Sequence, residues 1–321
     1  MDNKLDRKRI YIFIAIAFGL AWIVGLVVYL TGGIVNSPEI IPGAQITLAY
    51  VLIAVGYMWS PALANIFTRT ITREGWKNTG LRPQFKKSWK HWLAAWLLPP
   101  LFVIAGALVF FALLPKYFDP QLSTLKSMLP NQGVGFPMPL YMIILIQLAQ
   151  GVILSPIINS LFTFGEEFGW RGYLLQKLLP MGTKKAVLLS GVIWGIWHAP
   201  VIAMGHNYGF NYPLFPWTGI LMMIWFTTLL GIFMAWITIR SNTIWPAVIA
   251  HAVVNGVTGF SILLTKGEPS TLVGPVATGI LGGLGWLIAA IYLFSSKTAL
   301  LPQAEPVVGD NLAIHPDVEA G

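Results

Sequence analysis

The sequence has no cysteine and few charged residues. Without cysteine the chain cannot form a disulfide, use a thiolate nucleophile or bind a metal through sulfur. Asp, Glu, Lys and Arg make up 10% of its 321 residues, against roughly 25% in soluble domains. So few charges cannot cover a globule of this size in water, and we therefore exclude a soluble enzyme and a disordered protein.

Hydrophobic residues make up 56% of the chain, and the mean hydropathy is +0.70. The 14 tryptophans and 10 tyrosines also suit a bilayer protein, because their amphipathic rings sit well at headgroup depth. A membrane-spanning helix needs about 20 mostly apolar residues. The sequence therefore predicts an all-α, polytopic membrane protein with about eight transmembrane helices. The predicted spans cover residues 11–30, 44–67, 92–114, 140–163, 186–204, 217–239, 244–264 and 276–294.

The distribution of Lys and Arg predicts how the chain lies in the membrane. With the N-terminus inside, every basic residue falls on the cytoplasmic side except Lys116, Lys126 and Lys266. Cytoplasmic loops carry such an excess of Lys and Arg. We therefore expect a multi-pass protein of the cell membrane with both termini cytoplasmic, and a basic loop at 69–90 that lies on anionic lipid. The basic residues are dispersed along the chain, which argues against a nucleic-acid partner.

The composition along the chain predicts one transmembrane domain and a short tail. Residues 1–295 form the domain, and residues 296–321 are expected to be a disordered cytoplasmic tail, because they are rich in acidic residues and proline. The sequence shows no internal repeat and no glycine-rich phosphate loop. The oligomeric state stays open.

The first group of polar residues within apolar sequence is Gly165-Glu166-Glu167-Phe168-Gly169-Trp170-Arg171. A charge in lipid is costly unless it is paired or hydrated, so each such residue is a functional hypothesis. Glu167 and Arg171 are one helical turn apart and can neutralise each other. Glu166 has no partner on its own helix, and an unpaired carboxylate suits general-base catalysis. The competing interpretation is a salt bridge at an interfacial helix end.

Two further groups contain histidine: Trp194-Gly195-Ile196-Trp197-His198-Ala199-Pro200 and His251-Ala252-Val253-Val254-Asn255. Both histidines could simply hold packed helices together. The spacing of His251 and Asn255 puts them on one helix face. A carboxylate and histidines around water are typical of a hydrolase, and an Asn amide can stabilise an oxyanion. We therefore expect these groups to surround a polar intramembrane cavity.

The fourth predicted span also carries polar residues at a step of four, which puts them on one helix face. Counting residues along the spans places Glu166 near the cytoplasmic surface and His198 and His251 deeper. Tilt, a break near Pro156 or a later start of this helix would bring them to the same depth, and the sequence leaves these alternatives open. The residues at this spacing are Ser155, Asn159 and Thr163, followed by Glu167 and Arg171.

The three groups follow the patterns Glu-Glu-x-x-x-Arg, aromatic-x-x-x-His and His-x-x-x-Asn, in that order. Together they resemble the CPBP family of CAAX proteases and bacteriocin-processing enzymes, also called Abi, which includes the type II CAAX prenyl endopeptidases. The resemblance covers about residues 140–259. It implies an intramembrane peptidase of eight helices with a cavity open to the cytosol.

The resemblance also implies roles for the motif residues. Glu166 looks like the carboxylate that activates water, with His198 assisting. His251 and Asn255 look like the groups that orient water and form the oxyanion hole. The supporting pair would be Glu167 and Arg171.

The sequence departs from the family at Trp194, where Phe is usual, and we expect this to change the shape of the pocket more than its chemistry. The predicted activity is hydrolysis of a peptide bond of a membrane-associated substrate by glutamate-activated water. A prenylated CAAX protein is the substrate class that the resemblance suggests, and the sequence leaves the substrate's identity and its prenylation open. No cofactor is expected. Zinc is the alternative, because His and carboxylate are good ligands, but His-Glu-x-x-His is missing.

Two other functions compete with a protease. A non-catalytic membrane scaffold or bacteriocin-immunity protein of the same fold would be expected to lose a motif residue, and none is missing. A transporter would favour inverted repeats with broken helices in both halves. Here all the candidate chemistry lies in the second half of the chain.

Overall fold

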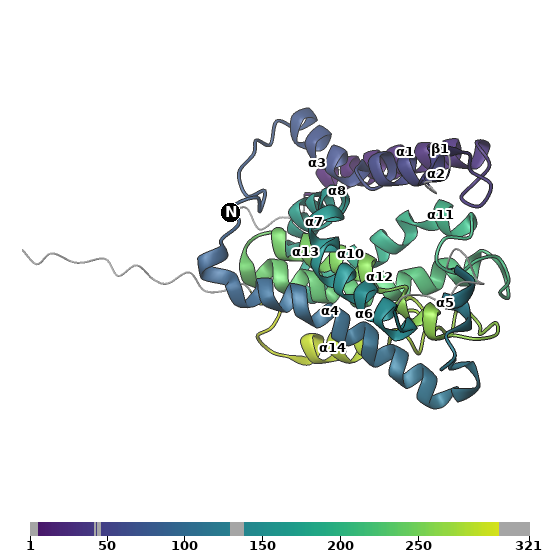
Figure 1. Cartoon of the computed structure of the whole chain (residues 1–321). Coiled ribbons are helices and arrows are strands. Elements are labelled where there is room, and N and C mark those ends of the chain that lie inside the picture. The colour runs from purple at the N-terminus through teal and green to yellow at the C-terminus, as the bar shows by residue number, and fades with distance from the viewer. Residues whose placement is uncertain (1–5, 42, 44–45, 129–137, 302–321) are drawn as a thin grey trace, which may run out of the picture.

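The computed structural model describes residues 6–41, 43, 46–128 and 138–301, and most of them are helical (Figure 1). Within this part of the chain, 6 helices are long and apolar enough to cross a membrane. The prediction of an all-α, polytopic membrane protein is therefore confirmed. These helices cover Arg7–Leu30, Leu48–Ile71, Phe85–Leu113, Leu140–Ile158, Trp217–Ser241 and Trp245–Leu264.

The other two predicted spans are shorter helices than expected. The fifth consists of α10 (Thr183–Trp197) and α11 (Ala199–Ala203), which are separated at His198. Proline at residue 200 is tolerated there because it stands in the first turn of the new helix. The eighth is reduced to α14 (Leu284–Ser295), since residues 276–283 form turns.

The N-terminal part of the chain forms one layer of the bundle (Figure 1). Helix α1 (Arg7–Leu30) begins at Asp6, whose carboxylate accepts a hydrogen bond from the Arg9 amide, and it packs along α3 (Ser60–Ile71). A small antiparallel pair, β1 and β2, lies between them in sequence. The remaining elements of this part are β1 (Glu39–Ile41), β2 (Ile46–Thr47), α2 (Leu48–Val51) and the π-helical turn η1 (Leu52–Tyr57).

Helix α12 (Trp217–Ser241) lies at the centre of the bundle and packs against α10, α13 (Trp245–Val257), α14 and α4 (Phe85–Leu113). The approach of α10 and α12 requires small residues. A Cβ built on Gly191 would lie 2.7 Å from the Thr228 Cα, and one on Gly195 would collide with the backbone of Ile224. The short helices at the periphery are η2 (Pro115–Tyr117), α5 (Ser123–Met128) and η5 (Phe260–Leu264).

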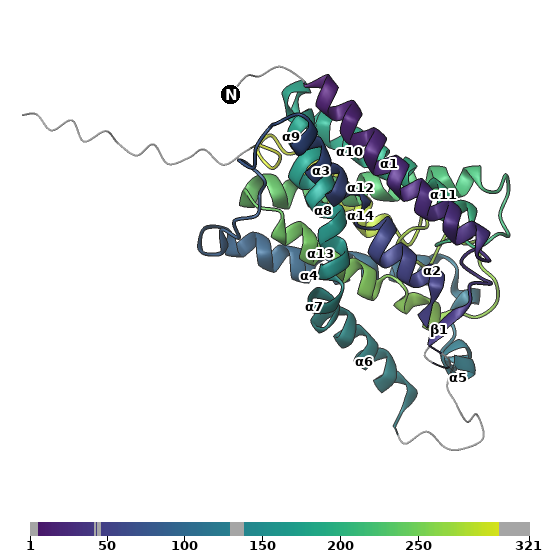
Figure 2. The same cartoon turned by 90° about the horizontal axis from the view of Figure 1, so that it is seen from above.

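The fourth membrane helix continues far beyond its predicted end at residue 163. Figure 2 shows its pieces following one another as a bent rod. Hydropathy ends the span at the charged residues, but the helix continues through them because they are buried in the bundle and because Glu167 and Arg171 form an ion pair. The successive pieces are α6 (Leu140–Ile153), α7 (Ser155–Ile158), α8 (Ser160–Gly169), the π-helix η3 (Trp170–Leu174), α9 (Leu175–Leu178) and η4 (Leu179–Met181).

The bend in this rod lies at Pro156. Proline has no N–H to donate to the carbonyl four residues earlier, and in lipid a free carbonyl costs several kcal/mol. The indole of Trp96 on α4 fills that role, because its Nε1 donates to the Val152 carbonyl at 2.6 Å. The anticipated break near Pro156 is therefore present, and it is joined to a neighbouring helix.

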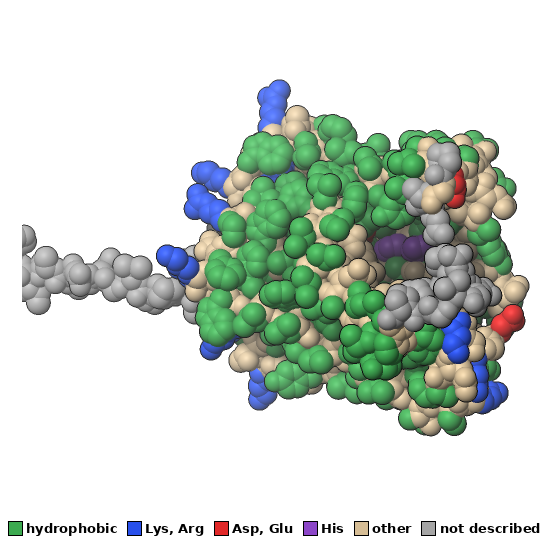
Figure 3. All heavy atoms as spheres, viewed as in Figure 1, with side chains coloured by type: hydrophobic (Ala, Val, Ile, Leu, Met, Phe, Trp, Pro, Cys, Tyr) green, Lys and Arg blue, Asp and Glu red, His purple; other side chains and the backbone are tan. Residues whose placement is uncertain are grey.

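Two ends of the molecule are rich in cations, with hydrophobic side chains between them (Figure 3). Hydrogen bonds show which segments share an end. At one end, Thr243 binds the Gly80 carbonyl and Arg240 binds the Leu301 carbonyl. At the other, the Asp119 amide binds Leu264, and Thr271 binds Tyr208.

The three exceptional lysines Lys116, Lys126 and Lys266 belong to this second end. These contacts agree with the division of basic residues that the orientation argument requires, except at Arg171, which is buried inside the bundle. Which end faces the cytoplasm stays a prediction. The division into residues 1–295 and a tail also stays a prediction, and residues 302–321 of that tail lie outside the described residues.

Candidate active site

Glu166 and Glu167 lie deep in the bundle on α8, with 3% and 0% of their surfaces exposed. The expectation that Glu166 lies near the cytoplasmic surface is wrong. The helical run continues for 12 residues from Glu166 to Leu178, which is about 18 Å at the rise of an α-helix. This extension of the helix places Glu166 at the same depth in the bundle as Trp194 on α10.

Glu167 pairs with two cationic or polar partners from two helices. Its carboxylate lies 3.1 Å from Nε of Arg171 and 2.9 Å from Nδ1 of His251. The predicted pair at i,i+4 is therefore present, and it also joins α8 to α13. Arg171 is 2% exposed, so its assignment to a cytoplasmic loop is wrong. Its counter-charge is in the same helix, which makes its burial possible.

Glu166 has a different environment. Its Oε2 accepts a hydrogen bond of 2.7 Å from Nε1 of Trp194, and no hydrogen bond joins its other oxygen to a described residue. We expected Trp194 to act mainly through its shape. The structure corrects this, because the indole N–H holds the carboxylate and phenylalanine has no such donor. The need of a buried Trp N–H for a partner was the signal in the sequence.

Trp194 lies at the centre of the three sequence groups. The centroid of its ring is 5.3 Å from that of His251 and 5.9 Å from that of His198. The Arg171 guanidinium carbon lies 4.3 Å from the Trp194 ring centroid. The structure therefore brings the first motif, the second motif and the histidine of the third into one buried cluster.

The hydrogen bonds of the two histidines indicate which ring nitrogen is free. Nδ1 of His198 lies 2.8 Å from the Trp194 carbonyl oxygen. A carbonyl only accepts, so we assign the proton to Nδ1, which leaves Nε2 with its lone pair. The Nδ1 of His251 faces the Glu167 carboxylate and is assigned as a donor in the same way. Nε2 of His198 can therefore accept a proton.

The polar residues at a step of four hold this helix against α13. Ser155 donates to the Ala252 carbonyl at 2.6 Å, and Thr163 donates to the Val248 carbonyl at 3.0 Å. Asn159 in turn donates to Ser155. These contacts continue into the Glu167–His251 pair, so the stripe positions the two acidic residues relative to His251.

Asn255 lies one turn beyond His251 on α13. Its side chain is exposed, and no hydrogen bond joins it to another described residue. The structure therefore gives no contact between Asn255 and the cluster around Trp194, and its role stays a prediction.

The cluster contains side chains of the kinds that bind zinc, namely carboxylates and imidazoles. Among residues 6–41, 43, 46–128 and 138–301, no group of three or more His, Asp or Glu side chains has the arrangement needed to hold a metal ion. His198 and His251 each use Nδ1 in a hydrogen bond, which leaves one nitrogen each. The expectation that no cofactor is needed stays a prediction.

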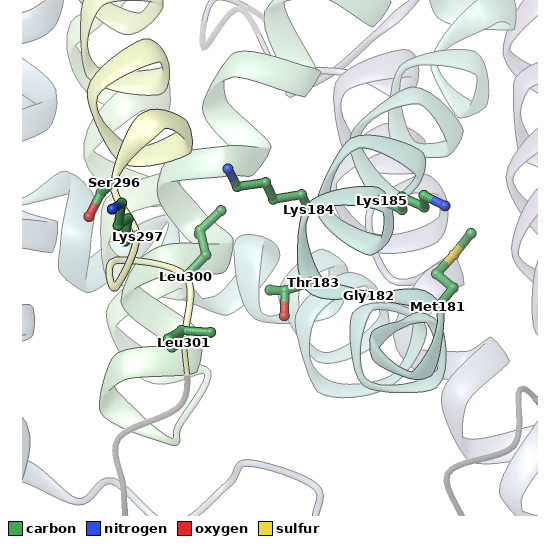
Figure 4. Close-up of a pocket in the computed structure, with 9 residues that line it drawn as sticks. All are labelled: Met181, Gly182, Thr183, Lys184, Lys185, Ser296, Lys297, Leu300 and Leu301. Atoms are coloured by element: carbon green, nitrogen blue, oxygen red, sulfur yellow. The ribbon is translucent and has the colours of Figure 1, made fainter.

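The surface of the molecule contains hollows that differ in their position relative to the cluster around Trp194. Figure 3 shows a hollow below α2 with a histidine side chain visible inside it, in a face that lies between the two cationic ends. A separate hollow of about 360 Å³ lies at the start of α10, where Lys184 and Lys297 extend from two different segments (Figure 4). Thr183 there is 11 residues before Trp194, or about 16 Å along the helix. This second hollow belongs to the first cationic end and not to the cluster.

The fold and the cluster define a polytopic membrane protein with a buried carboxylate–histidine site. The family model described as type II CAAX prenyl endopeptidase Rce1-like matches residues 137–257, which include all six candidate site residues. The curated CAAX prenyl protease 2 of Methanococcus maripaludis is 32% identical over 95 residues, which are 28% of this chain and 34% of that protein. The resemblance predicted from the three motifs is therefore confirmed. The chain spans about a third of the length of this relative.

Proposed function

We propose that the protein is an intramembrane endopeptidase that hydrolyses a peptide bond of a membrane-associated substrate. The observation that carries the proposal is the state of Glu166: a buried carboxylate with one oxygen held by Trp194 and with no hydrogen bond from its other oxygen to a described residue. An acceptor of this kind beside histidines suits water activation. The likeness to CAAX prenyl endopeptidases makes a prenylated CAAX-type protein the proposed substrate.

In the proposed mechanism, water binds at the free oxygen of Glu166 and gives it a proton as the water oxygen attacks the scissile carbonyl carbon. His198 assists through Nε2, and the proton then passes to the leaving amine. The Asn255 amide is the proposed donor to the oxyanion, and Nε2 of His251, which keeps its lone pair, is proposed to orient the water. Trp194 fixes the carboxylate, and Glu167 with Arg171 fixes the position of His251.

The test compares the two neighbouring glutamates. Glu166→Gln keeps the shape and an acceptor for Trp194 but removes the base, so turnover of a prenylated CAAX reporter peptide should fall by at least about 10²-fold while the melting temperature is kept. Glu167→Gln leaves Arg171 without its counter-charge, so stability should fall while residual activity persists. Glu268→Gln, at an exposed residue, serves as control for both assays.

The result that contradicts these roles is a Glu166→Gln variant that cleaves like the unmodified protein, or a Glu167→Gln variant that is inert yet fully stable. We also propose metal-free catalysis, because Glu166 can take the proton from water itself. Activity should therefore persist in a strong chelator. Loss of activity that added zinc restores would make His198 and His251 metal ligands instead.

A further inference from the structure

An apolar groove of about 660 Å³ lies between α4 and the bend of the fourth membrane helix, apart from the candidate active site. One wall consists of Trp89, Trp92 and Trp96 on α4. The opposite wall contains Ile153 and Ile157, which flank the bend at Pro156. These two isoleucines are 55% and 72% exposed, so the groove is open to the surroundings of the protein. The apolar side chains of its walls are suited to binding a hydrocarbon chain.

Three lysines lie at the start of α4, next in sequence to the groove residues Phe85 and Trp89. Lys86, Lys87 and Lys90 are exposed, and none of them has an ion pair among the described residues. The Lys90 Nζ lies 5.8 Å from the ring centroid of Trp89, which links the cations to the groove wall. The sequence contains no acidic residue between Glu74 and Asp119, so this segment of the chain supplies no counter-charge.

The order of these features along α4 matches the order of parts in a phospholipid. Trp89 and Trp96 are separated by seven residues of one helix, or about 10 Å of depth. The lysines stand at the shallow end, where aromatic rings mark the headgroup level. A juxtamembrane cation attracts anionic lipid by about 1 kcal/mol. A hydrocarbon chain running deeper from there would lie between Trp96 and Ile153.

We propose that this groove binds an anionic phospholipid. Its phosphate would be held by Lys86, Lys87 and Lys90, and one acyl chain would lie between the three tryptophans and the bend. The site is separate from the cluster around Trp194, and its existence does not depend on the proposed peptidase activity. The acyl chain would contact the bend that leads directly into α8, so the lipid would also support the position of Glu166.

The experiment measures thermal stability of the purified, delipidated full-length protein with added phosphatidylglycerol or phosphatidylcholine of identical acyl chains. Phosphatidylglycerol should raise the melting temperature by several degrees more than phosphatidylcholine. The variant Lys86→Gln/Lys87→Gln/Lys90→Gln should lose that difference. The matched control, Lys116→Gln/Lys126→Gln/Lys266→Gln at the other cationic end, removes the same charge and should keep it.

A second variant tests the acyl-chain part of the site. Ile157→Trp places a large side chain on the exposed lip of the groove, so it should reduce the amount of phosphatidylglycerol retained, measured by native mass spectrometry. Glycerophosphate, which has no acyl chain, should fail to stabilise the protein.

Three results would overturn the proposal. The first is an unchanged preference for phosphatidylglycerol in the variant of Lys86, Lys87 and Lys90. The second is unchanged lipid retention in Ile157→Trp. The third is displacement of the retained lipid by a prenylated CAAX peptide, which would assign the groove to the substrate.

Discussion

At the scale of single residues, the chemistry of the candidate site depends on which donor each buried carboxylate meets. Glu166 and Glu167 are adjacent in sequence and almost equally buried. Glu167 meets Arg171 and His251, whereas Glu166 meets the neutral indole of Trp194. One carboxylate is thus neutralised by its surroundings, and the other is held in place without a counter-charge in hydrogen-bond contact. This difference favours Glu166 as the reactive group.

Trp194→Phe tests whether the indole N–H positions that group. Phenylalanine keeps an aromatic ring but removes the donor to Glu166. A hydrogen bond to a charged group contributes about 1.5–3 kcal/mol, so kcat should fall by about 10- to 100-fold with KM little changed. The control is Trp286→Phe, which removes a buried indole N–H that has no partner among the described residues. A Trp194→Phe protein with unchanged kcat would show that the hydrogen bond does not position the base.

The sequence predicts the contact between Glu167 and Arg171 but does not predict the contact between Glu166 and Trp194. The pairing of Glu167 with Arg171 follows from their i,i+4 spacing on one helix, which is a local property. The bond between Trp194 and Glu166 joins residues 28 positions apart on two helices. Nothing local indicates such a contact, because it depends on the depth at which α8 and α10 pack.

At the scale of elements, the bend of the fourth membrane helix depends on a contact from another helix. Pro156 leaves the Val152 carbonyl without its helical donor, and Trp96 supplies one at 2.6 Å. Trp96→Phe should therefore lower the free energy of unfolding by about 1 kcal/mol. In a Pro156→Ala background the Ala N–H can bind the same carbonyl, so the cost of Trp96→Phe should largely disappear.

A double-mutant cycle measures this coupling by unfolding each of the four proteins in detergent. Additive effects of the two substitutions would mean that Trp96 stabilises the protein through packing alone.

The element boundaries show what hydropathy can and cannot predict. The predicted end of the fourth span at residue 163 is wrong because Glu167 and Arg171 neutralise each other inside the bundle, which a hydropathy scale does not take into account. The fifth span was predicted with nearly correct ends, but the break at His198 was not predicted. That break releases His198 from the middle of a regular helix and puts it at a helix end beside Trp194.

At the scale of the whole molecule, Glu74 joins three parts of the chain at one cationic end. Its carboxylate binds Lys177 and lies 2.9 Å from the Tyr173 hydroxyl, 3.4 Å from Arg9 Nε and 3.7 Å from Arg69 Nη1. Partial burial acts to raise the pKa of Glu74, but hydrogen bonds from Lys177 and Tyr173 and the nearby cations lower it below its ordinary value. Folding therefore favours the ionised carboxylate.

The stabilisation that follows from this lowered pKa has a definite pH dependence. It is fully present above the ordinary pKa of 4.5 and is lost as the pH falls through the lower pKa of the folded protein. Glu74→Gln should lower stability by about 1–3 kcal/mol at neutral pH and reduce the loss of stability on acidification. Melting temperatures between pH 7 and pH 3 measure both effects, with Glu268→Gln as the exposed control. Identical pH profiles for Glu74→Gln and the unmodified protein would contradict this role.

The final prediction concerns the orientation of the whole bundle. Contacts between distant segments place residues 80–81, 240–245 and 296–301 at one end, and residues 117–119, 208 and 264–278 at the other. All but three Lys and Arg residues of the predicted spans and loops were assigned to the first side. Because cytoplasmic loops are enriched in Lys and Arg, the first end should face the cytoplasm.

The absence of cysteine makes this orientation directly measurable, since each introduced thiol is the only one in the chain. Arg82→Cys and Lys297→Cys should react with a membrane-impermeant maleimide only after the cells are permeabilised. Asn211→Cys, in the exposed loop between α11 and α12, should react in intact cells. Three predicted crossings separate Arg82 from Asn211: α4, the fourth membrane helix, and α10 with α11. Reaction of Arg82→Cys and Asn211→Cys from the same side would therefore mean that one of these three does not cross the membrane. The opposite labelling pattern at all three positions would mean that the bundle is inverted.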